Sequence, residues 1–206
     1  MDRLYAIRPI LLVALAALVL PSCEKNGAEK PEARPTSSRV NAVQAKQEEK
    51  RAPKPAEFCD VYYEPSEAPD FAFPRLDSAA PELQADGWRW VNIWATWCDP
   101  CIEEMPRLVA WTNKLDPIAG LVLISADDRR QLVTEFRKEH PDTPTSLRFQ
   151  NPDTLPSWLS DFGMMGGSLP VHIFVDPDGK TRCLRASGVS EEEYDAVAEL
   201  VGAGEQ

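Results

Sequence analysis

Two cysteines, Cys98 and Cys101, stand two residues apart in the stretch WATWCDPCIEEMP, which covers residues 94–106. Such a pair can close a structural disulfide, supply half of a metal site, or exchange electrons as a dithiol. In a redox pair the thiolate is the attacking species, and the amides and dipole at the beginning of a helix stabilise it. Residues 90–95 are aromatic and β-branched as in a buried strand, and helical apolar spacing follows from 102 to 115. The sequence therefore predicts that Cys98 is an exposed attacking residue at a strand-to-helix junction and that Cys101 resolves the mixed disulfide.

Apolar and polar residues alternate along the rest of the chain in periods typical of strands and helices. A tight turn follows the third strand, and Ser190 with Glu193 makes a capping-box pattern before the last helix. Further strands are predicted at 121–125, 171–175 and 180–186, and helices at 129–140 (after Asp127 and Asp128 as cap candidates), 154–162 and after 190. Strands that alternate with helices and end in a hairpin predict an α/β domain with a mixed central sheet flanked by helices.

The segment from about Ala68 to Val201 resembles the exported, membrane-tethered thioredoxin-like thiol–disulfide reductases, the TlpA/ResA-like branch. The motifs that carry the resemblance are VNIWATWCDPC at 91–101, EMP at 104–106, LVLISADD at 121–128 and LPVHIFVDPDG at 169–179. The resemblance implies a thioredoxin-like fold with an N-terminal extension and an inserted strand–helix unit. It also implies a redox-active Cys98–Cys101 disulfide without a cofactor, which reduces disulfides of exported proteins, for example during cytochrome c maturation.

The resemblance assigns roles to further residues. Thioredoxin has a buried Asp where this chain has Asn92, which cannot titrate, so Glu104 takes the acid–base role. The alternative is that Glu104 is a solvated acid that complements the helix dipole. Pro170 matches the cis-proline that faces the dithiol, and the backbone of Leu169 before it pairs with an extended substrate. Trp97 shields the site and contacts substrate, or is a core residue.

His172 stands where this family more often has Thr or another small polar residue. With Cys98 and Cys101 as soft sulfur ligands, His172 suggests an alternative function, a copper-binding chaperone. The competing interpretation is a hydrogen-bonded strand residue and no metal site. A third alternative is a disulfide oxidase or isomerase of the same fold, although the negative charge of Asp99 beside the pair favours a reductant. Peroxide reduction fits poorly, because Thr96 does not have the Thr-x-x-Cys spacing of the related peroxidases.

The remaining three of the five cysteines suggest a bridge and an anchor. Cys59 lies at the entry of the predicted domain and Cys183 on its last strand, so an exported chain could join them, or leave both as free thiols. Cys23 ends the stretch LPSC after the unbroken apolar run 10–20, which resembles a bacterial lipoprotein signal. Lipidation of Cys23 would hold the protein on a membrane.

The composition divides the chain into a leader, a tether and a domain. Residues 1–22 are predicted to be the signal peptide, 23–57 a lipid-anchored disordered tether, 58–201 the domain and 202–206 a tail. The predicted location is the bacterial cell envelope, facing the periplasm or the exterior. The expected partners are disulfide-containing exported proteins and a membrane thiol–disulfide electron donor. The net charge of −11 argues against a nucleic-acid partner.

Overall fold

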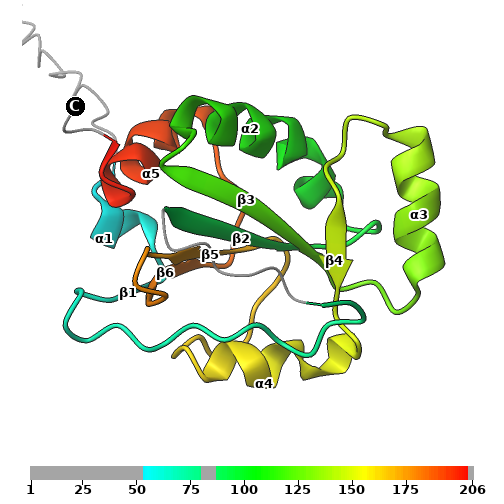
Figure 1. Cartoon of the computed structure of the whole chain (residues 1–206), viewed down its shortest axis with the longest axis horizontal. Helices are drawn as coiled ribbons and strands as arrows, with labels where there is room; N and C mark the ends of the chain where they lie inside the picture. Colours follow the sequence, from blue (N-terminus) through cyan, green and yellow to red (C-terminus); the bar gives the residue numbers. More distant parts are fainter. Residues whose placement is uncertain (1–52, 80–86, 204–206) are drawn as a thin grey trace, which may run out of the picture. The chain divides into compact units, whose positions relative to one another are not determined.

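The computed structural model describes residues 53–79 and 87–203. Helices and strands alternate along this part of the chain (Figure 1). The elements are α1 Pro55–Phe58, β1 Val61–Tyr62, β2 Trp88–Trp94, α2 Asp99–Leu115, β3 Ala119–Ser125, α3 Arg130–Glu139, β4 Ser146–Arg148, the 3₁₀ turn η1 Pro152–Thr154, α4 Leu155–Ser160, β5 Val171–Val175, β6 Thr181–Arg185, η2 Glu191–Glu193 and α5 Tyr194–Leu200.

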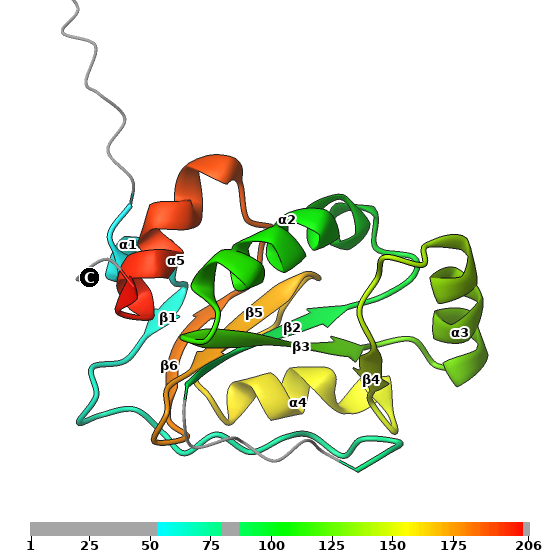
Figure 2. The same ribbon diagram turned by 45° about the horizontal axis from the view of Figure 1, so that its top comes forward.

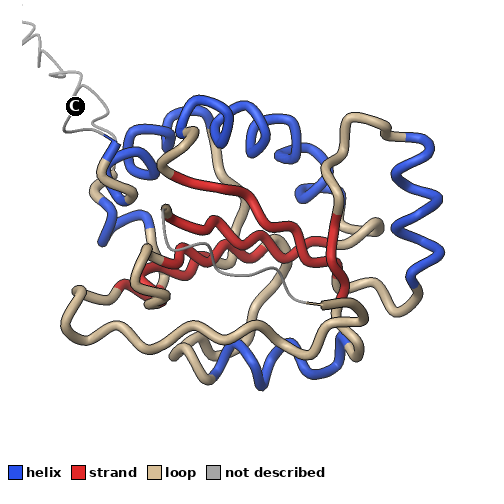
Figure 3. Tube along the Cα trace, in the orientation of Figure 1, coloured by secondary structure: helices blue, strands red, loops and turns tan. Residues whose placement is uncertain are grey.

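The strands form one six-stranded mixed sheet in the order β1-β6-β5-β2-β3-β4. Strand β2 pairs in parallel with β3, and β3 pairs in parallel with β4. The other pairs, β2 with β5, β5 with β6 and β6 with β1, are antiparallel. The α/β class with a mixed sheet that the sequence predicts is therefore confirmed. In Figure 3 the strands run together between helices that lie on both sides of the sheet.

The two faces of the sheet bury different side chains because successive residues of a strand point to opposite sides. On β2, Trp90 packs into the apolar cluster beneath α2 and α5, whereas Val91 and Ile93 pack into the cluster around α4. Figure 2 shows α2 and α5 over one face and α4 against the other. Helices cover β2 on both faces of the sheet, so its backbone is held firmly. The turn that follows Trp94 therefore starts from a fixed position.

Two chain segments meet at the end of β2. Ile93 of β2 pairs with Val171 of the antiparallel strand β5. The residues that follow β2 and those that precede β5 therefore lie at the same end of these two strands. The chain makes a turn after Trp94, and α2 begins at Asp99 with Cys98 as its N-cap. The peptide bond between Leu169 and Pro170, just before β5, is cis.

Several local expectations differ from the structure. The first helix begins at Pro55, a favoured residue for a first helical turn, so ordered structure starts before the predicted boundary at Phe58. Arg129 is the N-cap of α3 and its side chain makes no capping bond, so the prediction that Asp127 or Asp128 caps this helix is wrong. Ser190 and Glu193 do form the predicted capping box, on η2 before α5.

The predicted signal peptide, Cys23, the tether up to residue 52 and the last three residues of the tail lie outside the described residues. Within residues 53–79 and 87–203, no helix has both the length and the apolar character needed to span a membrane.

A disulfide joins Cys59, the residue after α1, to Cys183 of β6. Both side chains lie in the apolar cluster that contains Phe58 and Phe174. The bridge spans 124 positions of sequence, so it holds the N-terminal segment against the far end of the chain. A cross-link between distant positions removes conformations from the unfolded chain and thereby stabilises the folded one.

We expect replacement of both Cys59 and Cys183 by Ala to lower the free energy of unfolding by about 2–4 kcal/mol, the usual contribution of such a bridge. Urea unfolding of the full chain measures the change. The Cys98→Ala/Cys101→Ala variant, which loses a bridge over a short loop, is the matched control. Equal midpoints for the wild-type chain and the Cys59/Cys183 variant would show that the bridge contributes no stability.

Candidate active site

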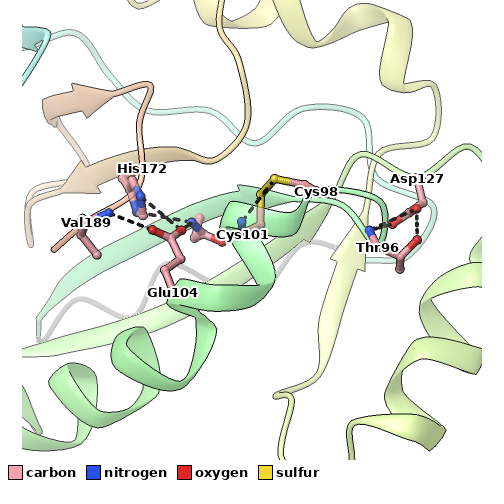
Figure 4. The surroundings of a disulfide bond; sticks show 8 residues. Thr96, Cys98, Cys101, Glu104, Asp127, His172 and Val189 are labelled. Carbon is pink, nitrogen blue, oxygen red and sulfur yellow. Dashed lines mark hydrogen bonds and ion pairs between the residues drawn. A yellow bond between two sulfur atoms is a disulfide. The ribbon is translucent and has the colours of Figure 1, made fainter. Parts of the chain in front are cut away.

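The Cys98–Cys101 disulfide lies at the first turn of α2 (Figure 4). Its sulfur atoms are 2.04 Å apart, and the backbone N–H of Cys101 donates to Cys98 Sγ at 3.3 Å. The amides of this turn therefore face the sulfur that would carry the negative charge in the reduced protein. Cys101 is fully buried and Cys98 is 5 % exposed, so the expectation of an openly exposed Cys98 is wrong.

A cleft of about 790 Å³ gives access to Cys98. Three segments that are distant in sequence line it: the turn before α2, the 3₁₀ turn with the start of α4, and the residues before the cis-proline. The lining residues are Trp97, Cys98, Asp99, Pro100, Ala126, Pro152, Asp153, Leu155, Pro156, Gly167, Ser168 and Leu169. Cys98 is one of the residues that line the cleft, so a reacting sulfur can reach it from there.

The predicted substrate-contact residues are distributed around the same cleft. Trp97 is 67 % exposed, so it is a wall of the cleft and the alternative of a core residue is excluded. Leu169 also lines the cleft, whereas Pro170 is buried behind it. Trp94 is a core residue, and its indole N–H donates to Ser146.

Glu104 is buried beneath the disulfide and only 2 % exposed. It follows Cys101 by three positions on α2, so the two side chains lie on one face of the helix. Its Oε1 accepts from Asn92 Nδ2 at 3.2 Å, and its Oε2 accepts from the backbone N–H of Val189 at 2.9 Å. The alternative of a solvated helix-end acid therefore does not apply to Glu104, although it fits Glu103, which is exposed.

His172 belongs to the same buried cluster. Its Nδ1 lies 3.1 Å from Trp90 Nε1 and 3.3 Å from Asn92 Nδ2. Its Nε2 lies 3.4 Å from Glu104 Oε1, and Figure 4 shows these two side chains next to each other. Within the described segments, no three or more His, Cys, Asp or Glu side chains are grouped as metal ligands. The set of Cys98, Cys101 and His172 proposed for copper is thus not assembled, and the imidazole is held by hydrogen-bonding groups instead.

Asp127 is a buried site residue that the sequence analysis misassigned as a helix cap. Its carboxylate accepts from the backbone N–H of Thr96 at 3.1 Å, from Thr96 Oγ1 at 2.6 Å and from Ser125 Oγ at 2.6 Å. It therefore fixes the turn that leads from β2 to Cys98 (Figure 4). The sequence signal that could have identified Asp127 is a carboxylate just after the apolar strand predicted at 121–125.

The AhpC/TSA family model matches residues 66–183, more than half of the chain. The protein belongs to the AhpC/TSA family. The match contains both site cysteines, Glu104, the cis-proline and most of the sheet. Family membership agrees with the thioredoxin-like arrangement that the sequence predicts, in which a disulfide at the first turn of a helix faces a cis-proline.

Curated relatives within this family are thiol-disulfide oxidoreductases named ResA. The chain is 27 % identical to ResA of Oceanobacillus iheyensis over 128 residues, which covers 58 % of this chain and 63 % of the relative. It is 30 % identical to ResA of Bacillus cereus over 122 residues, which covers 55 % of this chain and 64 % of the relative. The alignments thus span just under two thirds of these relatives.

Solved structures show the same fold. A DsbF homologue from Corynebacterium diphtheriae superposes with a TM-score of 0.55 at 17 % identity, covering 74 % of this chain and 98 % of that one. A putative thiol:disulfide interchange protein DsbE from Chlorobium tepidum superposes with a TM-score of 0.51 at 20 % identity, covering 66 % of this chain and 93 % of that one. The fold is therefore thioredoxin-like.

Replacement of Asp127 by Ala is expected to lower the free energy of unfolding by about 2–3 kcal/mol, because the Thr96 and Ser125 donors lose a charged, buried acceptor. Urea unfolding provides the measurement. Asp128→Ala is the matched control, since Asp128 is exposed and its replacement should change stability by less than about 0.5 kcal/mol. Equal losses in the two variants would contradict a specific role for Asp127.

Proposed function

We propose that the protein is an extracytoplasmic thiol–disulfide oxidoreductase that reduces disulfides of exported proteins through a mixed disulfide at Cys98. The observation that carries the proposal is the Cys98–Cys101 disulfide at the first turn of α2, at the end of a cleft that the cis-proline segment borders. The names of the ResA relatives support the same reaction class.

The reaction transfers two electrons from the reduced protein to a client. The Cys98 thiolate attacks one sulfur of the client disulfide, forms the mixed disulfide and expels the first client thiolate. Cys101 then loses its proton and attacks Cys98 Sγ, which closes the Cys98–Cys101 bond and expels the second client thiolate. The client thiolates take up protons from water, and a dithiol donor returns two electrons to the protein.

Glu104 is placed to receive the proton of Cys101. The carboxylate is buried on the same face of α2 as Cys101, where water cannot easily take the proton. Asn92, the neighbouring β2 residue, has no titratable group and acts here as a donor to Glu104. A general base must lie near the proton that it accepts, and Glu104 is the buried carboxylate on the helix face that carries Cys101.

The cleft suits an extended peptide next to its cystine. Trp97 offers an exposed aromatic wall, and Leu169 offers backbone beside the disulfide, so a client strand can pair with it while its side chains contact apolar surface. The acidic residues Asp99 and Asp153 at the edge of the cleft favour clients without strong negative charge near the cystine.

The cellular setting extends this proposal to partners. A lipidated Cys23 after a signal peptide of residues 1–22 would anchor the domain at the envelope membrane, facing the periplasm or the exterior. The electron donor there is a membrane thiol–disulfide protein, and apocytochrome c before haem attachment is one client class. The acidic net charge of −11 supports protein clients and no nucleic acid.

We expect the reduction potential of the Cys98–Cys101 pair in the full chain to be near or below about −270 mV, as in thioredoxin. The exposed carboxylate of Asp99 disfavours a thiolate beside it and thus favours the disulfide form, which makes the reduced protein a stronger reductant. Equilibration with dithiothreitol buffers and alkylation measures the potential. A value of about −120 to −180 mV would identify an oxidase or isomerase instead.

Replacement of Cys101 by Ser is expected to trap the mixed disulfide, because Cys98 can attack a client but nothing resolves the product. The reduced variant, mixed with insulin and quenched with acid, should give a covalent adduct on a non-reducing gel that dithiothreitol removes. The Cys98→Ser variant is the control and should give none. An adduct of equal yield in that control would show that the attack is not specific to Cys98, because Cys101 or Cys23 then reacts equally well.

A further inference from the structure

A buried polar cluster lies under the redox disulfide on the α2 side of the sheet. Trp90 and Asn92 from β2, His172 from β5 and Glu104 from α2 form it, and all four are buried. Asn92 and His172 are cross-strand partners in the β2–β5 register, so the backbone holds their side chains together. A buried polar group needs hydrogen-bond partners, and the donors and acceptors of this cluster therefore constrain one another.

The surroundings of Nδ1 define the tautomer of His172. The indole Nε1–H of Trp90 can only donate a hydrogen bond, and it points at His172 Nδ1 at 3.1 Å. Asn92 Nδ2 lies 3.3 Å from the same atom and 3.2 Å from Glu104 Oε1, so its two hydrogens serve both. If the side-chain amide of Asn92 were turned by 180°, its Oδ1 would face the Glu104 carboxylate, and two acceptors would then oppose each other. Nδ1 is therefore an acceptor without a hydrogen, and the ring hydrogen is on Nε2.

The Nε2–H group of His172 faces the Glu104 carboxylate. Among the described residues Nε2 has no hydrogen bond of standard geometry, and it lies 3.4 Å from Glu104 Oε1. A small rotation brings the two groups together, and no second hydrogen fits on the ring, because Nδ1 already receives two donors. Glu104 thus has groups that can donate to its carboxylate on three sides, from Asn92, Val189 and His172.

We propose that His172 is a positioning residue for the redox reaction. In its neutral Nε2–H form it holds the Glu104 carboxylate ready to accept the proton of Cys101. This inference rests on the proposed role of Glu104 as that acceptor. When Cys101 resolves the mixed disulfide, its proton moves to Glu104, its sulfur bonds to Cys98 Sγ and the client thiolate leaves. The proton remains on Glu104 and does not pass to His172, since Nδ1 is occupied, and Glu104 then loses it to water.

The other charged groups near Glu104 have partners of their own. On α2, Arg107 pairs with Glu191 and donates to the carbonyl of Val189. On β6, Arg185 pairs with Glu193 and donates to the carbonyl of Gly188. Neither arginine is bonded to Glu104, so of the titratable side chains described on the packed elements, His172 is the one in contact with its carboxylate.

Two substitutions separate the proposed donor role from packing. The Nε2 of a glutamine occupies about the place of the histidine Nε2, so His172→Gln keeps a donor to Glu104. The shorter side chain of asparagine matches the Nδ1 position, so His172→Asn keeps an acceptor for Trp90 and loses the donor to Glu104.

The assay follows the reduced full chain as it reacts with dithiodipyridine. Cys98 attacks the reagent and releases the first thiopyridone, and Cys101 then resolves the adduct and releases the second. The two rates are measured against pH, and the Cys98→Ala/Cys101→Ala variant gives the background from Cys23. Because the reagent replaces the client, the result is independent of whether the protein reduces exported proteins.

In His172→Asn the second release is expected to be about tenfold slower, since Glu104 loses the donor that orients its carboxylate. The first release is expected to stay within about twofold of wild type, and His172→Gln is expected to restore the wild-type profile. A profile of His172→Asn that superimposes on wild type overturns the proposal, as does an equal loss of rate in the two variants.

Nitrogen NMR of the full chain tests the tautomer without a variant of the site. The chain has two histidines, and His140→Asn identifies the His172 signals. The proposal requires a hydrogen on Nε2 and none on Nδ1 in both redox states. A hydrogen on Nδ1 overturns it.

Discussion

The attachment of α2 to the end of the central strand is the constraint on which the rest of the site depends. Strand β2 lies between β3 and β5 and is covered on both faces, so its C-terminal end cannot shift without disturbing the whole core. The chain has only residues 95–98 in which to leave β2 and begin α2. The buried carboxylate of Asp127 holds this short turn through Thr96. Cys98 is therefore fixed by the sheet through a few strong bonds, and its reactivity is set by a rigid frame.

Polar groups buried in an apolar layer distinguish the α2 side of the sheet from the α4 side. The α4 side carries aliphatic and aromatic contacts of the ordinary kind. On the α2 side, Asn92, His172 and Glu104 interrupt the aromatic packing and contact one another. Burial of such groups costs free energy that hydrogen bonds only partly offset, so stability alone does not account for them. The proposed mechanism would account for them, because in it a proton leaves Cys101 at a place without bulk water.

The N-terminal segment pairs with β6, which would otherwise be an edge strand of the sheet. Strand β1 pairs with β6 at this edge, and the Cys59–Cys183 bridge fastens the segment covalently. An unpaired edge strand can pair with other chains, and a very short edge strand such as β1 offers few groups for such pairing. The two disulfides thus serve distinct purposes, one in stability and one in electron transfer.

The sequence by itself determined the local features: the Cys98–Cys101 spacing at a strand-to-helix junction, the mixed α/β class and the Ser190 capping box. These depend on residues close together in the chain, where periodicity and short-range chemistry act directly. The tertiary structure decided which distant side chains meet. Glu104 lies beside His172, Asp127 bonds to Thr96, and the turn before α4 lines the same cleft as Cys98. Such contacts depend on strand register and helix packing, since a slip of one residue turns every side chain of a strand to the opposite face.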